Sequence, residues 1–163
     1  FDFDAHHGDG TENLTADNPM VLTYSVHEKG IFPGTGNESN PEKNIYNLPL
    51  VNKETGWDLG KGDDGLSKAV SDFIHDISEF KPDLVFIAAG ADGHREDPLS
   101  SLTYSIDGYR DISKCIRRFY PDLPILIGGA GGYLPDTRTP EVWATVAHAI
   151  ATTLTFDEEF PTS

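Results

Sequence analysis

Two short segments of this sequence carry side chains whose types and spacing suit metal binding. Residues 2–11 read DFDAHHGDGT, and residues 90–99 read GADGHREDPL. On an extended strand successive side chains point to opposite faces, so Asp2, Asp4 and His6 would share one face. Carboxylate oxygens and imidazole nitrogens are ordinary zinc ligands, and three such groups are costly to bury unless they bind a cation. The alternative interpretation is a polar strand edge that faces solvent.

The second segment offers a third metal ligand. Asp92 follows the apolar run LVFIAA at residues 84–89, which is typical of a strand buried on both faces. Three protein ligands and one open position form the usual catalytic zinc site. Taken alone, Asp92 would be a turn or helix-cap aspartate, but next to the first segment the ligand interpretation is stronger. The same ligand atoms also suit iron or cobalt.

A third segment, GGAGGY at residues 128–133, combines glycines with a tyrosine. Glycines allow a backbone to approach a ligand closely. A phosphate-binding loop is poorly supported, because no Gly-Lys-Ser/Thr sequence follows. Tyr133 could instead donate a hydrogen bond to an oxyanion, or it could be a core or loop residue.

The elements that must position these segments follow from the hydrophobic pattern. Short apolar or alternating runs predict strands, and apolar residues three and four apart predict helices. The expected strands are 1–5, 20–26, 45–50, 84–89 and 124–127, and the expected helices are 66–80, 107–120 and 140–155. Alternating strands and helices predict an α/β fold, an open parallel sheet with helices on both faces. Sites in such folds lie beyond the carboxyl ends of the strands.

The composition limits the classes of function. The 163 residues suffice for one domain, and no apolar run approaches the roughly 20 residues of a membrane helix. The net charge of −15 should repel nucleic acids and anionic membranes and favour cationic substrates, although it can also reflect solubility or salt adaptation. The single cysteine, Cys115, excludes an intrachain disulfide and fits a reducing compartment, so we expect a cytoplasmic protein.

Together with HEKGIFPGTG at residues 27–36, the three segments resemble the histone deacetylase family. This family includes acetoin utilisation proteins and acetylpolyamine amidohydrolases, and the resemblance covers residues 1–145. It implies the arginase/deacetylase type of α/β fold and a zinc-dependent amidohydrolase that removes acetyl or other acyl groups. Acetyl-lysine, acetylpolyamine or a similar small-molecule or peptide amide would be the substrate. The alternative is a catalytically silent member of the fold that binds acylated ligands or a partner.

The resemblance also implies roles for individual residues. Asp4, His6 and Asp92 would bind Zn²⁺, and Tyr133 would polarise the scissile carbonyl and stabilise the tetrahedral intermediate. Phe32 would line one wall of the substrate tunnel, with Leu99 near its floor. A structural K⁺ would be surrounded, largely through backbone oxygens, by Asp2, Asp4, His6, Ser25 and Val26. Asp2 and Asp9 would hydrogen-bond two histidines of the family's catalytic pair.

One departure from the family pattern concerns that histidine pair, which the family carries upstream of the zinc-binding strand. Nothing precedes Phe1 in this sequence, and His7 should face away from His6, so His6-His7 is no substitute. We therefore expect residues 1–163 to be the C-terminal, zinc-binding portion of a catalytic domain whose N-terminal part is missing. By itself this portion should be weakly active or inactive. The sequence leaves a homo-oligomer open.

Other metal-dependent hydrolases fit less well. Arginases use Asp-Ala-His-x-Asp for two metals, whereas this chain has Gly8 at the last of these positions. Their second cluster reads Asp-x-Asp, and here His94 takes the place of the second aspartate. Both differences favour one metal ion. A metallophosphoesterase is poorly supported, because no Gly-Asn-His-Glu/Asp segment follows.

Overall fold

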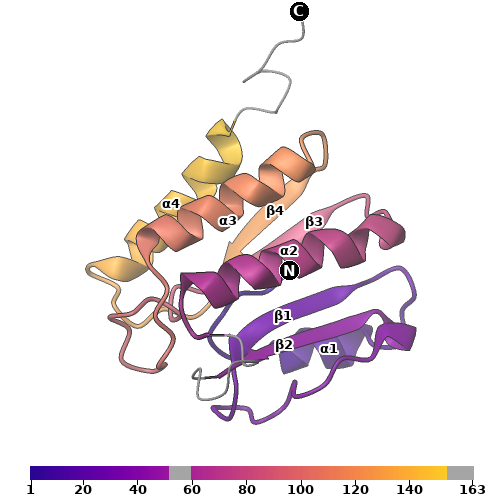
Figure 1. The fold of residues 1–163 in the computed structure, drawn as a ribbon, viewed down its shortest axis with the longest axis horizontal. Coiled ribbons are helices and arrows are strands. Elements are labelled where there is room, and N and C mark those ends of the chain that lie inside the picture. Colours follow the sequence, from indigo (N-terminus) through magenta and orange to yellow (C-terminus); the bar gives the residue numbers. More distant parts are fainter. Residues whose placement is uncertain (52–59, 154–163) are drawn as a thin grey trace, which may run out of the picture.

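A computed structural model describes residues 1–51 and 60–153 of the chain (Figure 1). In chain order its elements are α1 (Asp9–Thr15), β1 (Thr23–Glu28), the short 3-10 helix η1 (Pro41–Lys43), β2 (Ile45–Leu50), α2 (Asp63–Phe80), β3 (Val85–Ala89), α3 (Ile106–Phe119), β4 (Ile125–Gly129) and α4 (Arg138–Thr152). The predicted alternation of strands and helices is confirmed, and β2 has the predicted bounds. The glycines at positions 56, 60 and 62 also predict a loop at residues 51–62, of which positions 52–59 lie outside the described residues.

The strands form two parallel pairs, joined by the first residues of the chain. β1 pairs with β2, and β3 pairs with β4. Asp2 bridges Ser25 of β1 on one side and Ala88 of β3 on the other. Its amide donates to the Tyr24 carbonyl at 2.8 Å, and its carbonyl accepts from the Val26 amide at 2.9 Å. The segment with the first metal-binding motif therefore lies at the centre of the sheet.

The strand predicted at residues 1–5 is wrong in its extent, because the regular pairing is limited to Asp2. The Asp4 amide bonds to the Asp2 carboxylate at 2.9 Å, and the His6 amide bonds to the Asp4 carboxylate at 2.8 Å. These side chains take amides that a continuous strand would give to its neighbours. The alternation of faces is nevertheless retained, because Phe3, Ala5 and His7 are buried.

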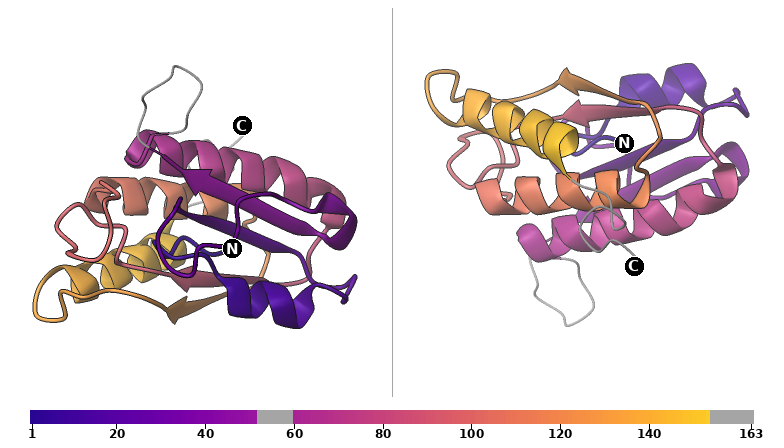
Figure 2. Two further views of the ribbon diagram at one scale, coloured as in Figure 1. Left: turned by 90° about the horizontal axis from the view of Figure 1, so that it is seen from below. Right: turned by 90° about the horizontal axis from the view of Figure 1, so that it is seen from above.

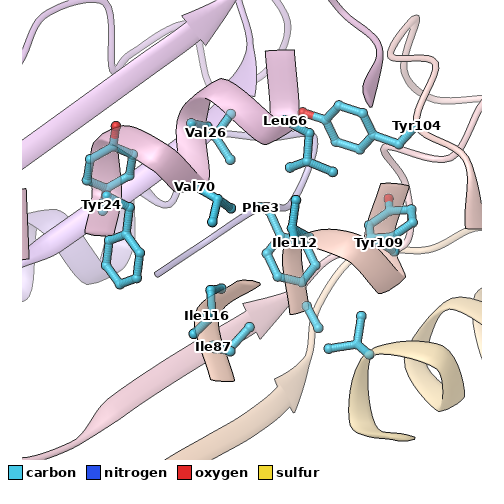
Figure 3. Packing of buried hydrophobic residues seen from close by; sticks show 14 of the residues in the cluster. Phe3, Tyr24, Val26, Leu66, Val70, Ile87, Tyr104, Tyr109, Ile112 and Ile116 are labelled. Atoms are coloured by element: carbon cyan, nitrogen blue, oxygen red, sulfur yellow. The ribbon is translucent and has the colours of Figure 1, made fainter. Parts of the chain in front are cut away.

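Helices lie on both sides of β1 and β2, as predicted, whereas β3 and β4 are covered on one face among the described residues (Figure 2). In both views of Figure 2, α2 and α1 lie on opposite sides of β1 and β2. Helix α3 packs between α2 and α4, so these three helices form one layer. The core between this layer and the strands contains Phe3 and Ile87 from the strand side and Leu66, Val70, Ile112 and Ile116 from the helices (Figure 3). This core fixes the central segment and β3 beside each other.

Two predictions about strands need correction. The strand expected at 20–26 begins at Thr23 and continues to Glu28, because turn hydrogen bonds to Asn18 occupy the amides of Met20 and Val21. The run at 84–89 is not buried on both faces, since Phe86 is 51% exposed. Among the described residues, Phe86 and Leu126 form an open apolar face of β3 and β4. No helix in residues 1–51 and 60–153 is long and apolar enough to span a membrane.

Candidate metal centre

Three residues separated by as many as 88 positions bring their ligand atoms together at the ends of the central segment and β3. His6 Nδ1 lies 3.0 Å from Asp4 Oδ1 and 2.9 Å from Asp92 Oδ2. One ligand atom from each residue lies within 4.8 Å of the others. The convergence predicted for Asp4, His6 and Asp92 is therefore present in the structure.

Backbone amides hold both carboxylates in place. Asp4 Oδ1 accepts the amide of His6, and Asp4 Oδ2 accepts the amide of Gly131 at 2.6 Å. Asp92 Oδ1 accepts the amide of Ala5 at 2.8 Å, which leaves Oδ2 directed at His6. Each carboxylate thus accepts a hydrogen bond from a residue distant in sequence, and these bonds hold the three segments together.

The electrostatics of this cluster favour a bound cation. Burial and the neighbouring Asp4 charge raise the pKa of Asp92 to about 7, and Asp92 is fully buried. Burial alone would lower the pKa of His6, but the carboxylates of Asp4 and Asp92 outweigh it and raise that pKa. Two carboxylates and an imidazole at these separations match the ligand types and number of a zinc site with an open position. The residues fit the metal that the sequence predicts.

Two glycines make room for the cluster. A Cβ atom on Gly131 would collide with Asp92 Oδ2 and would lie 2.7 Å from Asp4 Oδ2. A Cβ atom on Gly90 would lie 2.7 Å from Asp4 Oδ2. Ala130, by contrast, is exposed, which explains why a side chain is accommodated at that position of the glycine run.

Tyr133 lies beside the cluster. Its ring centroid is 6.5 Å from that of His6, with the two planes at 83°. The side chain is 46% exposed. Partial burial and the Asp92 charge raise the pKa of Tyr133, so the phenol keeps its proton and remains a hydrogen-bond donor at neutral pH.

The residues predicted to surround potassium, and those predicted to bond the histidine pair, lie outside the three-residue cluster or at its edge. Asp2 pairs directly with Ser25, next to Val26, so three of the residues expected around potassium are neighbours. Burial raises the pKa of Asp2 to about 6, although its bond to the Asp4 amide opposes the shift. Asp9 begins α1, where its amide donates to the His7 carbonyl. The potassium site and the histidine partnerships of Asp2 and Asp9 remain predictions.

The two predicted tunnel residues lie on exposed loops. Phe32 is 79% exposed and Leu99 is 52% exposed. Two buried histidines hydrogen-bond the loop that carries Phe32. His7 Nδ1 lies 2.8 Å from the Thr35 hydroxyl, and His27 Nε2 lies 3.0 Å from the Gly36 carbonyl. His7 therefore faces away from the candidate metal ligands, as predicted, and its ring bonds Thr35 and Glu12.

Sequence reasoning missed one buried polar residue near the site. Asp97 is 6% exposed, and its carboxylate accepts the amides of Leu99 and Tyr133. The signal was available in the Asp-Pro dipeptide at 97–98, because an aspartate often accepts the amide two residues further on. Its second bond, to Tyr133, depends on the tertiary fold and has no sequence signal.

Comparison with known proteins identifies the wider relationship. Residues 1–150 match a family model described as the histone deacetylase domain. A probable deacetylase from Archaeoglobus fulgidus is 34% identical over 119 residues, which are 69% of this chain and 31% of the relative. The acetoin utilization protein AcuC from Bacillus subtilis is 34% identical over 157 residues, 89% of this chain and 38% of the relative.

Solved structures share the same fold. The crystal structure of an acetylpolyamine aminohydrolase from Burkholderia pseudomallei superposes with a TM-score of 0.76 at 22% identity, over 93% of this chain and 44% of that one. The predicted arginase/deacetylase type of α/β fold is thereby confirmed. The chain spans about a third of the length of the curated relatives it matches.

Proposed function

This chain belongs to the histone deacetylase family, and from that membership we propose that residues 1–163 form the metal-binding part of a zinc-dependent amidohydrolase. The proposed reaction is hydrolysis of an acyl amide, which releases a carboxylate such as acetate and a free amine. The observation that carries the proposal is the convergence of Asp4, His6 and Asp92 within 4.8 Å. A zinc ion held there would supply Lewis acidity toward the acyl carbonyl and the attacking water.

The residues of this chain have separate tasks in the proposed reaction. Asp4 and Asp92 supply negative charge, and His6 supplies a neutral nitrogen to complete the ligand set. The Tyr133 phenol donates a hydrogen bond to the carbonyl oxygen as that oxygen gains negative charge. The place of the Tyr133 ring beside His6, with centroids 6.5 Å apart, supports this role, and a tyrosine phenol is protonated at neutral pH.

The proton transfers fall to residues that the family resemblance places outside this segment. A tandem histidine pair would take a proton from water and return one to the leaving amine. We propose that Asp2 and Asp9 hydrogen-bond this pair, and that a structural K⁺ lies near Asp2, Ser25 and Val26. Asp2 is already held against β1 at Ser25, so a cation there would bind backbone oxygens of fixed position.

The substrate class that we propose is an acylated cationic amine, such as acetyl-lysine or an acetylpolyamine. The net charge of −15 supports attraction of such a substrate. Phe32 and Leu99 would contact its alkyl chain, because both are apolar and exposed on loops. The single cysteine fits our proposal of a cytoplasmic, reducing location.

The experiment that tests this function measures acetate release from acetyl-lysine peptides and acetylpolyamines. It uses the natural full-length polypeptide that contains these residues, with and without a zinc chelator. The control is Asp92→Asn, which keeps an oxygen for the Ala5 amide while removing a charged ligand atom. We expect release that chelation stops, that added Zn²⁺ restores and that the variant lacks.

Either of two results would contradict the proposal. Release that persists under chelation and in Asp92→Asn would rule out a metal-dependent reaction at this cluster. A folded, zinc-loaded protein that releases no acid from any amide would favour the alternative of a silent, ligand-binding member of the family.

A further inference from the structure

The strongest unassigned feature of the molecule is the buried carboxylate of Asp97, which joins two loops. Asp97 Oδ1 accepts the Leu99 amide at 3.0 Å, and Asp97 Oδ2 accepts the Tyr133 amide at 2.9 Å. One carboxylate thus holds the backbone of the proposed carbonyl-polarising residue and of a proposed tunnel residue. Neither bond belongs to the metal ligand set.

The backbone on either side of Tyr133 is held by other hydrogen bonds, at Gly131 and at Leu134. Both backbone groups of Gly131 are hydrogen-bonded. Its amide donates to Asp4 Oδ2, and its carbonyl accepts from the Ala91 amide at 2.7 Å. Between Gly131 and Tyr133 stands Gly132, which has no side chain to restrict the backbone. Beyond Tyr133, the Leu134 amide donates to Thr139 Oγ1 at 3.2 Å, and the Leu134 carbonyl accepts from the Thr139 amide at 3.1 Å. Between these two fixed points, the bond to Asp97 is the contact that holds the Tyr133 amide itself.

The loop that contains Asp97 is itself held firmly. The Asp97 amide donates to the His94 carbonyl at 2.8 Å. The neighbouring Glu96 forms two hydrogen bonds with Arg138 at the start of α4, at 2.9 and 3.1 Å. Because α4 packs into the core, these bonds connect the loop that contains Asp97 to a buried helix.

We propose that Asp97 is a positioning residue that sets the place of the Tyr133 phenol relative to the metal ligands and to Leu99. This inference rests on the proposed function, because it assigns Asp97 a task in the same reaction. A misplacement of about 1 Å at a reacting group can cost about a hundredfold in rate. Loss of the Tyr133 anchor should therefore lower kcat while the metal remains bound.

Asp97→Asn separates the two bonds. Asparagine has one acceptor oxygen, and we expect that oxygen to keep the local bond to the amide two residues on, that of Leu99, as asparagine commonly does in turns. Its NH₂ group then faces the Tyr133 amide, and two donors cannot bond. In the full-length protein we expect kcat to fall by about 10- to 100-fold, with KM changed by less than about threefold and zinc content unchanged. Asp17→Asn is the matched control, because its side chain is exposed and lies far along the sequence on the turn after α1.

A double-variant test distinguishes positioning from general stability. If Asp97 acts through the Tyr133 phenol, Asp97→Asn should cost less than about threefold in kcat once Tyr133 is already phenylalanine. A loss of the same size in both backgrounds, a parent-like kcat in Asp97→Asn, or loss of zinc from that variant would overturn the proposal. Should Asp97→Asn fail to fold, Asp97→Glu keeps both acceptor oxygens and should fold with a lowered kcat. If neither variant folds, Asp97 is a folding residue and the proposal is overturned.

Amide hydrogen exchange tests the geometry without relying on activity. In the parent the Tyr133 amide should be protected, and in Asp97→Asn it should exchange faster, while the Ala91 amide stays unchanged as an internal reference. Equal exchange of the Tyr133 amide in both proteins would overturn the positioning role. A parent with no metal-dependent hydrolysis would instead overturn the proposed function, and hydrogen exchange would still decide whether Asp97 holds Tyr133.

Discussion

The metal ligands and the proposed tunnel residues occupy contrasting surroundings in the same molecule. Asp92 is fully buried, and amides from residues far away in sequence bind the oxygens of Asp4 and Asp92. Phe32 and Leu99, in contrast, expose most of their side chains on loops. Hydrogen bonds within the described residues hold the proposed ligands, whereas the proposed tunnel residues are mostly exposed.

This difference predicts that substitutions in the two regions will have unequal costs. A change near the ligands must fit between carboxylates and backbone that already touch, so almost any added atom is costly. An exposed loop residue can be exchanged without displacing a neighbour, because surface substitutions usually change stability by less than about 0.5 kcal/mol. Variants at the two regions should therefore differ in metal binding, in rate and in substrate preference.

The largest effect should follow from Gly131→Ala. The added Cβ atom would collide with Asp92 Oδ2, and the Asp4 carboxylate at 2.7 Å leaves no space for the backbone to retreat. Loss of groups that orient metal ligands typically lowers metal affinity by about 10- to 100-fold. Enzymes of this kind accelerate hydrolysis by roughly 10⁶-fold or more, and the proposed metal centre would supply most of that acceleration. We therefore expect the displaced centre to lower activity by more than about 10³-fold. Zinc content and acetate release measure the two effects.

The matched control for that variant is Gly10→Ala in α1, where an added Cβ atom has no neighbour within 4 Å. Alanine is also favoured over glycine within a helix. Gly10→Ala should keep full zinc content and the parent rate. A zinc-loaded, active Gly131→Ala protein would show that the ligand cluster tolerates displacement, and the contrast between the two regions would then be wrong.

A smaller effect is expected for Tyr133→Phe, which changes one donor and no metal ligand. Removal of a hydrogen-bond donor to a developing oxyanion typically costs about 10²- to 10³-fold in kcat. Zinc content should be unchanged, since the Tyr133 hydroxyl belongs to none of the three ligands. Tyr120→Phe is the control, because its hydroxyl bonds the Ile74 carbonyl at 3.0 Å, away from the ligands. Equal kcat values for both variants would remove Tyr133 from the proposed reaction.

Much of the fold was predictable because hydrophobic spacing is a local property. The helices predicted at 66–80, 107–120 and 140–155 correspond to α2, α3 and α4, with ends that differ by up to three residues. The pattern could not indicate what covers a strand. An apolar run such as residues 84–89 is compatible with burial on both faces, yet Phe86 is exposed on one of them.

The part of the site that could be predicted from spacing is the part whose residues lie close together in the sequence. Asp4 and His6 share a face because they are two residues apart, but their approach to Asp92 depends on a sheet that places distant segments side by side. The place of Asp92 just past an expected strand suggested that link, and the resemblance to a family assigned the three residues their roles as ligands. Asp97 was missed because its bond to Tyr133 joins residues 36 positions apart and leaves no periodic signal.

The smallest effect on turnover should follow from Phe32→Ala. This variant tests whether an exposed, proposed tunnel residue contacts the substrate. The side chain is exposed in the structure, so its truncation should leave zinc content and thermal stability unchanged. If the substrate covers about half of the Phe32 side chain, kcat/KM should fall by about tenfold or less, since complete burial of such a side chain stabilises by roughly 1.5–3 kcal/mol, or about 10- to 150-fold. The loss should grow with the length of the acyl chain or amine.

The control for Phe32→Ala is Leu14→Ala, which truncates an exposed apolar side chain on α1 and should change kcat/KM for no substrate. Equal behaviour of the two variants over a panel of acyl amides would mean that Phe32 is an ordinary surface residue, and that the substrate channel lies elsewhere.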